Sequence, residues 1–332
     1  MSSARFDVVA IGNALVDVIS NESFETLASL GLTPGSMSLV DAERVAELYT
    51  KLGPATEASG GSAANTIVGV ASFGGNAAFI GRVADDEFGH IYAHDLRSIG
   101  VHFDSPIAPA TGTPTGRCLV VVTPDAERTM STFLGAGTDM DPTYVDAEVI
   151  GDAHVLYLEG YLWDQPPAME AFRRAASVAH AAGRKVALSL SDSFCVERHR
   201  DAFLDLIAGS VDILFGNEDE ILALYQVSDF DAAVQLVRGH CEIAALTRGA
   251  SGSTVVTDSD VISVPAATVA KVVDTTGAGD LYAAGFLYGY TRGHALETCA
   301  VLGGIAAAEV ISHVGARPLT SLAGLAQSAL GS

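Results

Sequence analysis

The chain has 332 residues, 49% of them apolar and 17% charged, and this composition indicates a globular protein and excludes a disordered one. Its net charge of −22, from 40 acidic and 18 basic residues, repels nucleic acid and anionic lipid, so neither is expected as a partner. No apolar run is long enough to cross a bilayer, and Asp7 interrupts the start of any signal region, so we expect a cytoplasmic protein.

The N-terminal half contains short segments that resemble strands. The segment FDVVAIGNALVDVIS (6–20) predicts a strand whose later part carries Asn13 and Asp17 among apolar neighbours. SMSLV (36–40) and parts of 104–134 predict short antiparallel strands joined by turns. Because these strands interrupt an α/β core and lie far apart in the sequence, we predict one domain over residues 1–332 with a discontinuous lid at about 14–40 and 104–134.

From about residue 150 onwards, strands alternate with amphipathic helices. This order predicts an α/β fold with a mostly parallel central sheet and helices on both faces. Ligands of such sheets bind beyond the carboxyl ends of the strands. The residues at those positions are Glu159-Gly160, Ser191-Asp192, Gly216-Asn217 and Asp274-Thr275.

The four cysteines and nine histidines show no pattern of a metal site or disulfide. The cysteines form no CxxC pair, and the histidines form no HExxH motif. We therefore expect no transition-metal centre and reduced, mostly buried thiols. They are Cys118, Cys195, Cys241 and Cys299.

The segment VVDTTGAGDLYAAGF (272–286) places small residues before a carboxylate at a predicted helix start. In one interpretation Asp280 is a helix N-cap and the glycines form a tight turn. In the other, the N–H groups of Gly277, Ala278 and Gly279 bind an anion, and Asp280 is the general base of a phosphoryl transfer. Neither a GxxxxGK[ST] loop nor a GxGxxG fingerprint occurs.

DTTGAGD (274–280) resembles the phosphotransfer signature of the ribokinase-like (PfkB) carbohydrate and nucleoside kinases. Further motifs of that family follow the expected order over nearly the whole chain: GNALVD (12–17), ASGGSAAN (58–65), IGRVADDEFG (80–89), FGNEDE (215–220), LTRGASGS (246–253) and HVGA (313–316). The resemblance implies a ribokinase-like fold with a small β-strand lid, Asp280 as catalytic base and Gly277-Ala278-Gly279 as the anion hole. It also implies ATP, Mg²⁺ and a small-molecule substrate as ligands, in a monomer or homodimer.

On the nucleotide side, the resemblance assigns Asn217 and Glu220 to Mg²⁺, largely through water, although N-x-x-E is also the form of a capping box. LTRGASGS also fits a hairpin turn. The resemblance adds a monovalent-cation (K⁺) site near Asp274, Thr276 and Gly315. The residues that it places around the nucleotide are Thr247, Arg248, Gly249, Gly252, His313, Gly315 and Ala316.

On the acceptor side, the resemblance places a carboxylate, amides and glycines around the vicinal hydroxyls of a ribose or sugar. Arg128 resembles a lid arginine that closes on the transferred phosphates, or is an isolated surface arginine. Met37, Leu39 and Leu134 resemble the apolar wall for a purine in adenosine kinases, or pack in the core. The residues around the hydroxyls are Asn13, Asp17, Gly60, Gly61 and Asn65.

These observations predict an ATP- and Mg²⁺-dependent kinase that phosphorylates the 5′-hydroxyl of adenosine to give AMP and ADP. The alternative within the class is a kinase of a ribose- or fructose-like sugar. A catalytically silent nucleoside-binding regulator is an alternative from another class. A Rossmann dehydrogenase is the third, and it lacks the glycine fingerprint.

Overall fold

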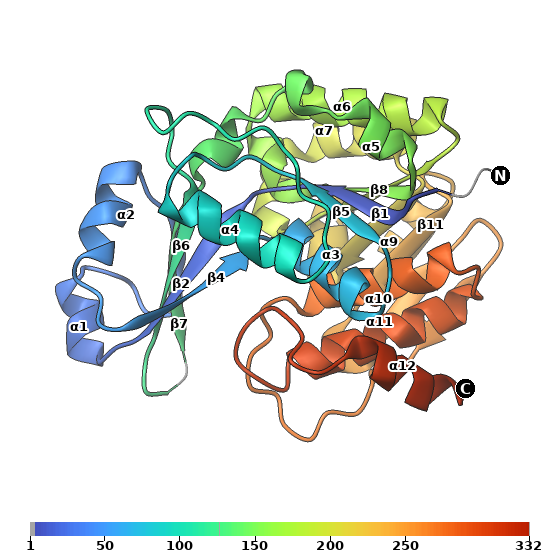
Figure 1. The fold of residues 1–332 in the computed structure, drawn as a ribbon. Coiled ribbons are helices and arrows are strands. Elements are labelled where there is room, and N and C mark those ends of the chain that lie inside the picture. Colours follow the sequence, from blue (N-terminus) through green and yellow to red (C-terminus); the bar gives the residue numbers. More distant parts are fainter. Residues whose placement is uncertain (1–3, 126, 332) are drawn as a thin grey trace.

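The computed structural model describes residues 4–125 and 127–331, which form two β-sheets with helices around them (Figure 1). The large sheet has the order β13-β12-β11-β10-β9-β8-β1-β5. It is parallel from β5 to β11 and ends in an antiparallel edge of β12 and β13. The predicted α/β class with a mostly parallel sheet is therefore confirmed. Its strands are β1 (Phe6–Ile11), β5 (Ala77–Ile80), β8 (Ala153–Glu159), β9 (Lys185–Ser189), β10 (Ile213–Asn217), β11 (Ile243–Thr247), β12 (Ser253–Val256) and β13 (Val261–Val264).

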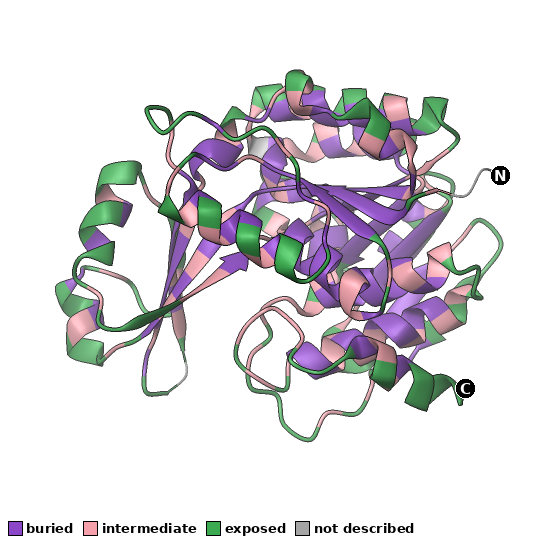
Figure 2. Ribbon diagram, in the orientation of Figure 1, coloured by how far each residue is buried: buried purple, intermediate pink, exposed green. Residues whose placement is uncertain are grey.

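Helices cover both faces of the large sheet, as parallel strands buried on both sides require. Alternate residues of one strand enter different cores, so Val8 packs with the helices of one face and Val9 with those of the other. Figure 2 shows the buried residues concentrated in the strands and on the helix sides that face them. The first face carries α3 (Ser62–Ser72), α4 (Glu87–Ser98), α10 (Ala278–Thr291), α11 (Leu296–Val310) and α12 (Leu322–Leu330); the second carries α5 (Ala147–Gly151), α6 (Pro166–Ala181), α7 (Ser193–Ser210), α8 (Glu218–Tyr225) and α9 (Phe230–Val237).

The small sheet has the order β3-β7-β6-β2-β4 and is covered on one side by α1 (Phe24–Ser29) and α2 (Ala42–Tyr49) (Figure 1). Val18 and Leu119 on that side pack against Val45 and Leu48 of α2. Along β2 the residues of the other side are only half buried. This side is called the open face below. The strands are β2 (Leu15–Asn21), β3 (Met37–Leu39), β4 (Ala55–Gly60), β6 (Gly116–Val122) and β7 (Arg128–Phe133).

Two local predictions differ from the structure. The segment 6–20 forms two strands rather than one, because the chain leaves the large sheet after Ile11 and enters the small sheet at Leu15. β3 runs parallel to β7, whereas an antiparallel arrangement was predicted. The small sheet also includes β4, which lies outside the two predicted lid segments. The movement of the small sheet as a lid stays a prediction.

Two expectations from composition can be compared with the structure. All four cysteines are thiols, and three of them are buried, in agreement with the prediction of reduced, mostly buried thiols. Within residues 4–125 and 127–331, no helix is both long and apolar enough to cross a membrane.

Helices α10 and α11 approach closely because glycines lie at their crossing. A Cβ atom added at Gly285 would lie only 2.4 Å from the carbonyl oxygen of Leu302. We therefore expect Gly285→Ala to lower the free energy of unfolding by about 1–3 kcal/mol through overpacking. Gly209 in α7 has no neighbour within 4 Å of such an atom. Gly209→Ala should leave stability unchanged or raise it by up to about 1 kcal/mol.

Urea unfolding followed by circular dichroism measures both changes. Equal midpoints for Gly285→Ala and the unmodified chain would show that the two helices can separate without loss of stability.

Candidate active site

The loop before α10 ends in a left-handed residue from which the helix starts. Gly277 is the N-cap with φ +78°, and a Cβ atom there would lie 2.8 Å from the Cβ of Ala316. The helix begins at Ala278, so Asp280 is its third residue, and the N-cap interpretation of Asp280 is wrong. The N–H groups of this first turn have no acceptor within the helix. Ala278 N–H donates to the carbonyl oxygen of Thr275 at 3.2 Å, and the space in front of Gly279 is open. The geometry suits an anion beside the helix N-terminus.

Two side chains of α3 hold the carboxylate of Asp280. Ser62 Oγ donates to Oδ1 at 2.6 Å, and Asn65 Nδ2 donates to Oδ2 at 3.0 Å. Burial raises the pKa of Asp280, while these two hydrogen bonds lower it. Gly61 is the N-cap of α3, and Ser62, the first residue of the helix, points to the carboxylate.

Glu159, a buried residue at the end of β8, connects this strand with the residues after β1 and with the start of α3. Glu159 is 1% exposed, and Oε1 accepts hydrogen bonds from Asn13 N at 3.1 Å and Asn13 Nδ2 at 2.7 Å. Oε2 accepts one from Ala63 N at 2.8 Å. Burial raises the pKa of Glu159 to about 7, although these hydrogen bonds lower it. Glu159 was not among the predicted site residues, although the rule of strand carboxyl ends pointed to its position.

The predicted acceptor residues meet beside Asp280. Asp17 lies on the open face of the small sheet, and a Cβ atom at Gly60 would lie 2.4 Å from its Oδ2. Gly61 has φ +96°, and a Cβ atom there would lie 2.2 Å from the carbonyl oxygen of Asn13. Burial raises the pKa of Asp17 to about 6, and the charges of Arg317 and Arg128 lower it. A carboxylate and an amide in one site suit a diol, which donates to one and accepts from the other.

Arg128 of β7 reaches the loop before α10. Its Nη2 forms an ion pair with Asp274 Oδ2 at 2.7 Å, and the two side chains are only 13% and 7% exposed. Asp274 also accepts hydrogen bonds from Thr276 Oγ1 at 2.7 Å and from Gly315 N at 2.8 Å. Arg128 is therefore not an isolated surface residue, since it joins the small sheet to the phosphotransfer loop. The K⁺ site predicted around Asp274 and Thr276 stays a prediction.

Asn217 and Glu220 form a complete capping box at the start of α8. Glu220 Oε2 accepts from Asn217 N at 2.9 Å, and Asn217 Oδ1 accepts from Glu220 N at 2.9 Å. Burial raises the pKa of Glu220 to about 7, and the charges of Asp192, Asp219 and Asp280 raise it further. Hard oxygen ligands in so acidic a setting fit a hydrated Mg²⁺. Within the described residues, no group of three metal-ligating side chains forms a closed cage.

The other predicted nucleotide residues lie on two separate segments. Thr247 to Gly252 form the connection between the antiparallel strands β11 and β12, as the hairpin interpretation predicted. Arg248 forms an ion pair with Glu218, in which Nη2 lies 2.8 Å from Oε1. His313 Nε2 lies 3.3 Å from Glu309 Oε2, and Ala316 packs against Gly277. The roles of these residues in nucleotide binding stay predictions.

The three apolar residues predicted for the acceptor wall differ in burial. Met37 is 49% exposed and Leu39 is 57% exposed, so the core-packing interpretation is wrong for both. Leu134 is half buried, and its carbonyl oxygen packs against Gly116.

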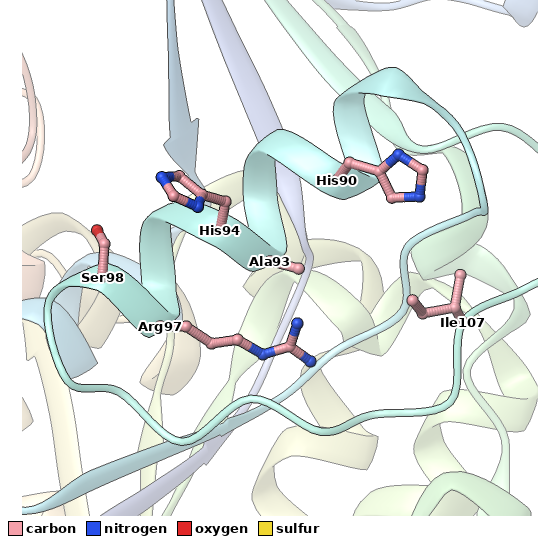
Figure 3. A pocket seen from close by; sticks show the side chains of 6 residues that line it. All are labelled: His90, Ala93, His94, Arg97, Ser98 and Ile107. Atoms are coloured by element: carbon pink, nitrogen blue, oxygen red, sulfur yellow. The ribbon is translucent and has the colours of Figure 1, made fainter.

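A hollow of about 440 Å³ lies on α4, and none of the predicted site residues lines it. The rings of His90 and His94 point away from each other (Figure 3), so they do not form a metal-binding pair. Its lining residues are His90, Ala93, His94, Arg97, Ser98 and Ile107.

Comparison with known proteins agrees with this geometry. Residues 7–322 match the family model described as pfkB family carbohydrate kinase, so the chain belongs to the pfkB family of carbohydrate kinases. An adenosine kinase structure from Sinorhizobium meliloti is 50% identical and covers 98% of this chain and 100% of its own, with a TM-score of 0.91. A probable sugar kinase from Rhizobium etli CFN 42 is 48% identical, with coverages of 98% and 99% and a TM-score of 0.91. A 5-dehydro-2-deoxygluconokinase of Shouchella clausii (strain KSM-K16) is 26% identical over 93% of this chain and 90% of its own.

Family membership confirms the predicted resemblance and defines the enzyme class. The protein is an ATP-dependent phosphotransferase with an alcohol group as acceptor, and its ligands are ATP and a small molecule. The dehydrogenase alternative is wrong. A carboxylate at a helix N-terminus beside an open anion site suits this chemistry, because the acceptor hydroxyl lies between the base and the phosphoryl group.

The pH dependence of the reaction tests the hydrogen bond from Ser62. As the predicted base, Asp280 would act only when ionised, and Ser62→Ala removes a donor that lowers its pKa. We therefore expect the acidic limb of kcat/KM to move to higher pH in Ser62→Ala, measured from about pH 4 to 9.

Ser98→Ala, at the exposed end of α4, is the control and should leave the profile in place. A limb that stays in place or moves to lower pH in Ser62→Ala would show that this hydrogen bond does not stabilise the ionised base.

Proposed function

We propose that the protein phosphorylates the 5′-hydroxyl of adenosine with Mg²⁺·ATP, giving AMP and ADP. The observation that carries this proposal is the apolar open face beside Asp17. One row across the small sheet pairs Asp17 of β2 with Cys118, Cys118 with Thr132, and Thr132 with Leu39 of β3. Paired residues share a face, so Leu39 lies on the same face as Asp17.

The next row of the same face is apolar throughout. It pairs Ile19 with Val120, Val120 with Met130, and Met130 with Met37. Exposed apolar side chains beside a binding site are typical of a surface that a ligand covers. A purine offers a flat apolar ring for this surface, whereas a free sugar offers hydroxyl groups. The name of the Sinorhizobium meliloti relative supports adenosine too.

A sugar kinase is the second candidate, and a specific finding favours it. The curated relatives at 25–28% identity carry the name 5-dehydro-2-deoxygluconokinase, which supports a sugar acceptor more directly than adenosine. The diol-binding residues suit both acceptors, because a sugar and a ribose present the same vicinal hydroxyls. The two candidates therefore differ only in what covers the open face.

In the proposed mechanism, Asp280 takes the proton of the acceptor hydroxyl. The resulting oxygen attacks the γ-phosphorus, and the bond between that phosphorus and the ADP oxygen breaks. N–H groups of Gly277 to Gly279 and the dipole of α10 stabilise the negative charge of the transferred group. Asn217 and Glu220 would hold Mg²⁺ through water, and this ion would neutralise phosphate charge.

Arg128 supplies positive charge from the small sheet. It contacts Asp274 next to the phosphotransfer loop, so a small movement would bring its guanidinium onto the phosphates. The sheet that carries it also covers the acceptor, and its closure would exclude water from the reaction.

Asp280→Asn tests the base. The amide cannot accept the proton, so kcat should fall by roughly 100- to 10,000-fold while the KM for ATP and the melting temperature stay nearly unchanged. Asp231→Asn in the exposed first turn of α9 is a matched control and should keep full activity. Near-normal turnover by Asp280→Asn would remove this residue from proton transfer.

The acceptor is tested by ADP release from Mg²⁺·ATP with adenosine, inosine, ribose, fructose and 5-dehydro-2-deoxygluconate in parallel. We expect turnover with adenosine, and a Leu39→Ser variant should raise the KM for adenosine about tenfold by removing apolar contact. Turnover with a sugar and none with adenosine would select the second candidate. Stabilisation by adenosine without turnover of any acceptor would instead indicate a silent binder.

A further inference from the structure

Arg317 directly follows the last of the family motifs, HVGA (313–316), and lies beside the predicted acceptor residues. It comes from the segment after α11, and its guanidinium lies between β4 and α3. Nη1 donates to Ser59 Oγ at 2.5 Å, and Nε lies 3.5 Å from Asn65 Oδ1. Burial lowers the pKa of Arg317, and the nearby Tyr92, Asp17 and Asp95 raise it. Arg317 was not among the predicted site residues.

A purely structural role does not account for this arginine. Buried guanidinium groups usually pair with a carboxylate, as Arg128 does with Asp274. Within residues 4–125 and 127–331, Arg317 forms no such ion pair, although its charge lowers the pKa of the nearby Asp17. Its Nη2 atom is buried without a hydrogen-bond partner, and so is the hydroxyl of Tyr92. The structure therefore places a buried positive charge beside the acceptor residues without a direct ion pair among the described residues.

The amide of Asn65 lies between this positive charge and the negative charge of Asp280. Its oxygen faces Arg317 and its nitrogen donates to Asp280. A rotation of the amide by half a turn would bring its N–H groups against the guanidinium and its oxygen against the carboxylate. Each charge disfavours that rotation, so together they hold one orientation of Asn65.

Ser59 extends the same chain of contacts to α4. Its Oγ donates to Asp95 Oδ2 at 3.1 Å, and its backbone N–H donates to the same oxygen at 3.2 Å. The chain runs from Asp95 through Ser59 and Arg317 to Asn65 and ends at the catalytic carboxylate. It therefore connects the small sheet with the helices α3 and α10.

We propose that Arg317 is a positioning residue of the phosphoryl transfer, which fixes the amide of Asn65 and through it the carboxylate of Asp280. The inference rests on the kinase class of the protein and on Asp280 as its base, and it does not depend on adenosine as acceptor. It deepens the proposed function by adding a residue from outside the family motifs.

Arg317→Met tests the proposal, with Arg292→Met as the matched control. Arg292 lies at the other end of α10, so its loss weakens an ion pair without reaching the site. We expect Arg317→Met to lower kcat about 30-fold and to raise the acceptor KM, with the KM for ATP within about twofold. Arg317→Lys keeps the charge and should restore part of kcat. Arg292→Met should lower the melting temperature and leave kcat and both KM values unchanged.

A double-mutant cycle shows whether Arg317 acts through Asn65. If it does, adding Arg317→Met to Asn65→Ala should lower kcat by less than about threefold, because the amide to be positioned is already gone. Full additivity of the two losses would overturn the proposal, and so would a kcat and acceptor KM of Arg317→Met like those of the unmodified enzyme.

The assay uses whichever acceptor the unmodified enzyme phosphorylates, which separates this inference from the choice of acceptor. If the enzyme phosphorylates a sugar and not adenosine, the arginine variants are compared with that sugar as acceptor. If Arg317→Met does not fold, Arg317→Lys decides, since it should fold and still show a lower kcat than the unmodified enzyme. Unchanged kinetics in Arg317→Lys would then overturn the proposal.

Discussion

Two helices, α3 and α10, begin beside one carboxylate, and the rest of the site depends on this meeting. Asp280 belongs to the first turn of α10, and its two hydrogen-bond donors, Ser62 and Asn65, belong to the start of α3. Glu159 fixes α3 through the N–H of Ala63 and binds Asn13 with its other oxygen. The end of β1, the start of α3 and the end of β8 are thus held together by one buried side chain. Without that anchor, neither donor would have a fixed distance to the base.

Several acidic side chains are buried at the site, and burial makes their ionised forms unfavourable. Cationic ligands would reduce this cost. Burial raises the pKa values of Asp17, Glu159 and Glu220 to about 6, 7 and 7, each above its ordinary value. A raised acid pKa stabilises the fold at low pH, and this contribution is lost as the pH rises from about 4 through the folded value. The free enzyme therefore holds unfavourable negative charge near neutral pH. Cations that arrive with the nucleotide, together with Arg128, would compensate part of it.

Much of the site was visible in the sequence because short motifs carry it. The DTTGAGD loop, the paired glycines 60 and 61 and the capping box at Asn217 are local features, and each forms where its motif lies. Contacts between distant segments were not visible. Ser62 and Asp280 are 218 residues apart, and Arg317 and Ser59 are 258 residues apart. No local pattern distinguishes Ser62 as a helix cap from Ser62 as a donor to the base.

The residues proposed to select the acceptor lie in a different part of the molecule from the residues proposed to carry out the phosphoryl transfer. The proposed base, its donors and the proposed anion loop would serve any alcohol, and they lie on α3, α10 and the loop before α10. The open face belongs to the small sheet, where alternate residues of β2 point to α2 or to the open face. A substitution at Met37 or Leu39 can therefore change what covers that face without disturbing Asp280. This separation explains why one family signature is compatible with both sugar and nucleoside acceptors.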